Sequence, residues 1–73
     1  MKQSDFNTSL SVAVEFVCEV INTAMVRFNV DFDTIDKALS ASGYWDLFDN
    51  IEVTCVGAHD GVEPVLEEIK GYL

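Results

Sequence analysis

Polar and apolar residues alternate with the period of a helix over residues 9–28. Four polar residues recur every three or four positions: Ser11, Glu15, Glu19 and Asn22. This spacing places them on one narrow stripe of a helix. Most of the other residues are apolar, and they cover more of the circumference than the single face that is usual for a surface helix. β-branched residues weaken the helix propensity, but the period is not that of a strand. The pattern predicts a long, central helix.

A second helix is expected to begin at Asp31 and to end before Gly43. The Asp31 carboxylate can accept hydrogen bonds from the first turn, and Val30 before it can pack on Ile35. Gly43 stands where a residue in the left-handed conformation would end the helix. The residues expected to face inward are Ile35, Ala38 and Leu39.

Residues 44–50 predict a third, short helix, because Tyr44, Leu47 and Phe48 fall on one side at helical spacing. Residues 51–56 alternate weakly and are rich in β-branched side chains. They suit either an extended connector or a continuation of that helix. A single strand would lack a pairing partner in so small a domain.

The last helix is expected after a loop at residues 57–61. Asp60 and Glu63 have the spacing of a capping box, and Pro64 is acceptable in a first helical turn. An apolar stripe follows: Val62, Val65, Leu66, Ile69, Tyr72 and Leu73. The fold class is therefore all-α, or mainly α with one short extended segment, and the architecture is a compact bundle of about four helices.

The chain has 73 residues, of which 49% are hydrophobic, and this suffices for one small core. We expect a flexible N-terminus over residues 1–8 and a single helical domain over residues 9–73. Thirteen acidic residues against four basic ones give a net charge of −9. Because a phosphate backbone is repelled by this charge, nucleic acid is not an expected partner.

Neither a signal peptide nor a membrane span is expected. Asp5 precedes any apolar run, unlike in a signal peptide. Glu15, Glu19 and Arg27 interrupt the apolar stretch. Each charge near the centre of a bilayer costs about 2.5–3.5 kcal/mol. The sequence therefore predicts a cytoplasmic protein without a membrane partner.

Cys18 and Cys55 are the only cysteines, and we expect both to be reduced thiols, with Cys18 buried among apolar residues. Cys55 and His59 are the residues best placed for chemistry. A structural zinc site needs four ligands, and no third group is evident that would orient His59 as a base. We expect no enzyme activity, no cofactor and no metal site. A thiol- or metal-responsive protein that uses Cys55 and His59 is the alternative function.

The apolar excess of residues 9–28 carries the functional prediction. We expect the other helices to leave part of this helix uncovered, and a contiguous apolar patch of several hundred Å² marks a protein interface. Aromatic anchors dominate such interfaces. The competing interpretation is that Trp45 and its neighbours close the end of the core. The predicted interaction residues are Phe16, Val20, Tyr44, Trp45 and Phe48.

The sequence therefore predicts a non-catalytic protein–protein interaction module, which binds another protein or a second copy of itself. A homodimer is expected, because a shared apolar face would add stability that so short a chain lacks. The acidic exterior would steer a basic partner toward the protein.

The order of elements resembles that of a small bacterial family, domain of unknown function 3791, over about residues 12–73. The resemblance rests on the following features: Val30-Asp31, Gly43, Tyr44-Trp45-Asp46, Glu52-Val53, Gly61 and the acidic final helix. Members often carry a histidine three residues after the glutamate that corresponds to Glu52, where Cys55 stands here. The resemblance implies a compact helical protein that serves as an accessory or antitoxin-like partner of a neighbouring toxin-like or ADP-ribosyltransferase-like enzyme.

Overall fold

The computed structural model describes the backbone of residues 2–73 and the side chains of residues 9–73. Five helices make up the fold: α1 (Lys2–Phe28), α2 (Phe32–Ser42), α3 (Tyr44–Phe48), α4 (Ile51–Asp60) and α5 (Glu63–Lys70). The chain is 83% helical and has no strand within residues 2–73. The prediction of an all-α bundle is confirmed.

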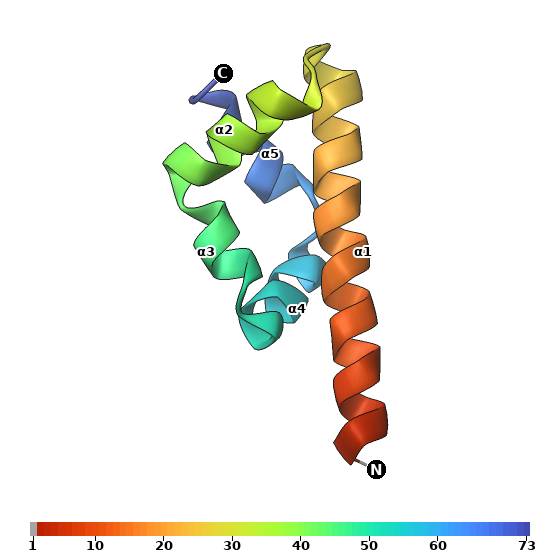
Figure 1. Ribbon diagram of the computed structural model, residues 1–73. Coiled ribbons are helices and arrows are strands. Elements are labelled where there is room, and N and C mark those ends of the chain that lie inside the picture. The colour runs from red at the N-terminus through yellow and green to blue at the C-terminus, as the bar shows by residue number, and fades with distance from the viewer. Residues whose placement is uncertain (1) are drawn as a thin grey trace.

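Helix α1 sets the length of the molecule. Its 27 residues span about 40 Å at 1.5 Å per residue, which matches the longest extent of 41 Å. The other four helices lie on one side of α1, and its N-terminal turns extend past α4 (Figure 1). One side of a long, apolar helix therefore receives all the cover that the chain provides.

The start of α1 differs from the expected one. The helix begins at Lys2, not near residue 9. The residues before position 9 lack the apolar period, but a helix that is already nucleated can extend through residues without it. The flexibility expected for the N-terminus over residues 1–8 stays a prediction.

Helix α2 has the ends that the sequence predicts. The Asp31 carboxylate accepts hydrogen bonds from Thr34 N at 2.9 Å and from Thr34 Oγ1 at 2.7 Å. These bonds lower the pKa of Asp31. Gly43 ends the helix with φ of 85°, in the left-handed region that suits glycine. The residues buried on α2 are Ile35, Ala38 and Leu39, as expected.

Residues 51–56 form the first part of a helix and not an extended connector. Asn50 caps α4, because its side-chain oxygen accepts a hydrogen bond from Val53 N at 3.0 Å. Thr54 Oγ1 donates to the Leu47 and Asn50 carbonyls, which ties α4 to the end of α3. These local bonds stabilise the helix, which was one of the two structures that the sequence left open for residues 51–56.

The loop expected at residues 57–61 is wrong for most of its length, because α4 continues to Asp60. The capping box expected between Asp60 and Glu63 is also absent, since Val62 precedes α5 without a side-chain cap.

Glu63 instead forms an ion pair with Arg27. The Glu63 carboxylate accepts from both Arg27 Nη atoms, at 2.7 and 2.8 Å, which links the end of α1 to the start of α5. The guanidinium lowers the pKa of Glu63.

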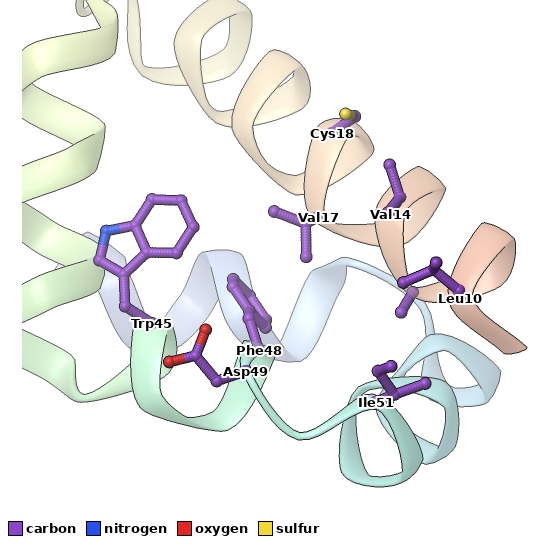
Figure 2. Close-up of a pocket in the computed structure, with 9 residues that line it drawn as sticks. Leu10, Val14, Val17, Cys18, Trp45, Phe48, Asp49 and Ile51 are labelled. Carbon is purple, nitrogen blue, oxygen red and sulfur yellow. The ribbon is translucent and has the colours of Figure 1, made fainter.

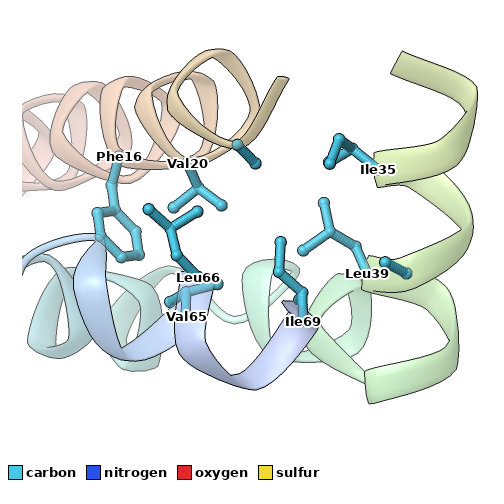
Figure 3. Close-up of a cluster of buried hydrophobic side chains, with 9 residues drawn as sticks. Phe16, Val20, Ile35, Leu39, Val65, Leu66 and Ile69 are labelled. Atoms are coloured by element: carbon cyan, nitrogen blue, oxygen red, sulfur yellow. The ribbon is translucent and has the colours of Figure 1, made fainter. Parts of the chain in front are cut away.

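The core lies between α1, α2 and α5 (Figure 3). Nine buried apolar residues form it: Phe16, Val20, Ala24, Ile35, Ala38, Leu39, Val65, Leu66 and Ile69. The expected apolar stripe of α5 supplies the last three. Tyr72 and Leu73, which the same pattern placed on that stripe, follow the end of the helix and are exposed.

Candidate functional site

Only a narrow stripe of α1 is buried by the rest of the chain. The buried residues of this helix, among the side chains described, are Ala13, Phe16, Val20 and Ala24. They are three or four positions apart and thus lie on one side. The apolar circumference of α1 is wider than this stripe. The expectation that the other helices leave part of it uncovered is confirmed.

Several uncovered apolar residues lie beside the buried stripe near the middle of α1, while Val12 and Val26 are exposed on other sides of the helix. Leu10 is 41% exposed and Val14 is 52% exposed. Cys18, four positions after Val14, is exposed as well, so the expected burial of this thiol is wrong. Cys18 lies two positions before the buried Val20, which places the two side chains on different sides of the helix.

These residues form one wall of a groove with a volume of about 220 Å³, which we call the α1–α3 groove. Its lining comes from α1, α3 and the start of α4: Leu10, Ala13, Val14, Val17, Cys18, Trp45, Phe48, Asp49 and Ile51. Figure 2 shows Leu10 and Val17 facing Ile51 and Phe48, with Cys18 at the outer edge. Asp49 is the only charged residue of the lining. The groove is therefore apolar, with one carboxylate.

The aromatic wall of the groove is held in place by contacts behind it. The centroid of the Phe48 ring lies 6.2 Å from that of Phe16 and 5.9 Å from that of Trp45, and both of these pairs meet edge-on. The centroid of the Tyr44 ring lies 5.7 Å from that of Phe48. Trp45 Nε1 donates a 2.8 Å hydrogen bond to the Asp36 carboxylate. Packing and this bond fix the wall before any partner binds, which reduces the entropy lost on binding.

The five predicted interaction residues divide between the core and the groove. Phe16 and Val20 are 5% and 0% exposed, so the prediction that they contact a partner is corrected: both are core residues. Trp45 and Phe48 line the groove. Tyr44 lines a smaller apolar cavity of about 90 Å³ together with Phe48, and burial raises its pKa.

Sequence reasoning missed the other wall of the groove. The residues of α1 that form this wall are Leu10, Val14 and Cys18, which are exposed, and Val17, which is partly buried. Their spacing of three and four positions is visible in the sequence. It was not separated from the neighbouring stripe of core residues, because both stripes are apolar and have the same period.

The one charge in the lining of the groove is negative. Besides Asp49, the acidic residues Glu15, Asp46 and Glu52 are exposed on the same three helices. The basic side chains within residues 9–73 are those of Arg27, Lys37 and Lys70, and none lines the groove. Arg27 pairs with Glu63, and Lys37 pairs with Asp33 at 3.3 Å.

Cys55 and His59 do not form a site together with further ligands. Cys55 is partly buried, and its Sγ lies 3.2 Å from the Ser9 carbonyl, while His59 is exposed. Among the residues described, no three His, Cys, Asp or Glu side chains are grouped to hold a metal ion. The thiol- or metal-responsive alternative gains no support from this geometry.

Ser9–Phe28 is long and apolar enough to cross a membrane, with a mean hydropathy of 1.5. This is weak support for a span, because the core helix of a soluble protein meets the same criterion. Only 22% of an 18-residue window in this segment is buried. The absence of a membrane span stays a prediction, as does a cytoplasmic location.

Comparisons with family models, with curated proteins and with solved structures give no match for this chain. The resemblance to domain of unknown function 3791 and the accessory role that it implies stay predictions.

Proposed function

We propose that this chain is a small, non-catalytic protein–protein interaction module of the cytoplasm, which binds through the α1–α3 groove. The observation that carries the proposal is that Leu10 and Val14, which are both exposed, line one groove together with the aromatic side chains of Trp45 and Phe48. An apolar surface rimmed by polar residues is typical of a protein interface.

The energetics favour binding at this surface. Covering the exposed part of a leucine or valine side chain contributes about 1 kcal/mol. Trp45 and Phe48 add aromatic anchors, which supply much of the binding energy at interfaces. The same surface would serve a second copy, as the predicted homodimer requires, or a different protein, as the predicted accessory role requires.

A pair of valine substitutions tests the proposal. Val14→Asp places a charge in the groove, and Val26→Asp places the same charge about 120° around the same helix, where Val26 is 83% exposed and outside the groove. The readouts are the solution mass by light scattering across protein concentrations and capture of a partner from the cell extract of the source. We expect Val14→Asp to abolish association, and Val26→Asp to leave it as in the wild type.

Two outcomes would overturn the proposal. The first is a wild-type protein that stays monomeric and captures nothing. The second is an association that the two valine variants weaken equally, since this would place the contact outside the groove.

A separate measurement addresses the thiol- or metal-responsive alternative. Elemental analysis would reveal a bound metal, and a thiol reagent would rank the two cysteines. Since Cys18 is exposed and Cys55 is partly buried, we expect Cys18 to react first. A bound metal, or a faster reaction of Cys55, would favour the alternative.

A further inference from the structure

We infer that the occupant of the α1–α3 groove is an amphipathic helix of another protein, in which lysine and arginine flank the apolar stripe. This inference rests on the proposed function and adds the chemical class of the partner. Three features of the groove carry it: its shape, its single carboxylate and the absence of a basic residue in its lining.

The shape of the groove suits a helix. Leu10 and Cys18 are eight residues apart, so the α1 wall extends for about 12 Å, or roughly two helical turns. Trp45, Phe48 and Ile51 form the opposite wall (Figure 2). Two apolar walls of this length accept side chains at positions i, i+3, i+4 and i+7 of an inserted helix. Strand addition would need a sheet edge, and residues 2–73 contain no strand.

The charges select a basic partner. Asp49 lines the groove and forms no ion pair within residues 9–73. Glu15 borders the adjoining hollow at Leu10, Ser11 and Val14. Lysine or arginine beside the apolar stripe of an inserted helix would neutralise these carboxylates. Such charges at the rim raise the association rate and set specificity.

The same charges disfavour a second copy as the occupant. Each copy carries a net charge of −9 and would bring its own Glu15 and Asp49 to the shared rim. Like charges that face each other across an interface oppose binding. The groove is therefore better matched to a basic helix than to itself.

Synthetic peptides test the inference on the full chain. The first probe is an 18-residue peptide of leucine and lysine, with leucine at helical i, i+3, i+4 and i+7 spacing. The second replaces every lysine by glutamate, and the third has the composition of the first in scrambled order. Binding is read from the emission of Trp45, the only tryptophan in the chain.

We expect the leucine–lysine peptide to bind about tenfold or more tightly than either control peptide, and to bind more weakly as salt is raised. The bound peptide should also slow the reaction of Cys18 with a thiol reagent, while Cys55 keeps its rate. Protection of Cys18 places the peptide in the groove and not elsewhere on the acidic surface.

A matched pair of variants isolates the carboxylate in the groove. We expect Asp49→Asn to weaken binding of the leucine–lysine peptide by about two- to fivefold. Asp60→Asn removes the same charge from the exposed end of α4, outside the groove lining, and should leave binding unchanged. Neither variant alters a residue of the buried core.

The inference is wrong if the scrambled or glutamate peptide binds as tightly as the first, or if both variants weaken binding equally. It is also wrong if no peptide binds while the protein forms a dimer that Val14→Asp disrupts, because the groove then serves a second copy. That last result would leave the proposed function standing. Transfer of the protein to uncharged phosphatidylcholine vesicles, with Cys18 protected, would replace the protein partner with a lipid surface.

Discussion

Two stretches of α1, residues 14–18 and residues 21–25, present the same apolar side but have different cover. Val14 and Ile21 are seven residues apart and share one side of the helix, as do Cys18 and Met25. Ile21 and Met25, in the C-terminal half, pack against the core cluster. Val14 and Cys18, one heptad earlier, are exposed. Equivalent positions are thus partly buried in one stretch and exposed in the other.

The apolar pattern of a helix therefore identifies its apolar sides but not which stretch of each side is covered. Cover depends on where the following helices run. α2 lies beside the C-terminal end of α1, and α4 packs on α1 at Ser9 and Phe16, while α3 stands farther from α1 across the groove (Figure 1). The uncovered stretch is thus a consequence of the path of the chain and not of composition.

The largest effect is expected from a charge placed on the covered stripe. Val20 is fully buried in the core, so Val20→Asp would bury a charge without a partner. We expect it to lower the free energy of unfolding by about 4 kcal/mol or more, which is enough to unfold most domains of this size. Val14→Asp, on the exposed side of the same helix, should change it by less than about 0.5 kcal/mol. Urea denaturation followed by circular dichroism measures both values. Similar losses in the two variants would contradict the assignment of Val20 to the core and of Val14 to the exposed side of α1.

Much of the fold could be predicted from local signals. Asp31 and Gly43 define α2 by backbone chemistry that acts within a few residues, and this prediction is confirmed. The start of α4 was less clear, because residues 51–56 combine β-branched side chains with a cap at Asn50. Their helical state depends partly on Thr54, whose hydroxyl bonds carbonyls at the end of α3. That contact forms only once the chain has turned between α3 and α4.

The next effect in size concerns the aromatic wall of the α1–α3 groove. Trp45→Phe removes the indole donor to Asp36 and reduces the packing against Phe48. We expect a loss of about 1–2 kcal/mol in the free energy of unfolding. Asp36→Asn keeps an oxygen acceptor at the same place and should lose less. Thermal or urea unfolding compares them, and an unchanged Trp45→Phe protein would show that the wall is not held by this bond.

The candidate site could be predicted only in part. Trp45 and Phe48 were identified because aromatic residues that follow a helix end are prominent in a short sequence. Phe16 and Val20 were assigned to the interface because their stripe and that of Val14 are both apolar. Long-range packing decides which stripe is buried, and no local signal in the sequence reports it.

A smaller effect, in the stabilising direction, is expected at Gly57. This glycine lies within α4 without a positive φ, beside the cavity of about 90 Å³. A methyl group there would lie 3.8 Å from Phe16 Cε2, at ordinary contact distance. Gly57→Ala should raise the free energy of unfolding by about 1 kcal/mol, through helix propensity and a less flexible unfolded chain. Gly43→Ala, at a φ of 85°, should have the opposite sign. Melting temperatures test both, and destabilisation by Gly57→Ala would show that the cavity cannot accept the methyl group.

The smallest effect is expected at the ion pair between Arg27, at the end of α1, and Glu63, at the start of α5. The Arg27 guanidinium lowers the pKa of Glu63 in the folded protein below its unfolded value near 4.3. The stability that this carboxylate contributes is therefore present above the unfolded pKa, and it is lost as the pH falls through the folded pKa. Because both side chains are exposed, the contribution is small and is screened by salt.

Between pH 5 and pH 3 at low salt, the Glu63→Gln variant should lose less stability than the wild type. The control is Glu19→Gln, which changes an exposed glutamate of α1 outside this pair and should keep the wild-type pH dependence. Equal pH profiles for all three proteins would mean that the contact between the C-terminal end of α1 and α5 depends on packing alone.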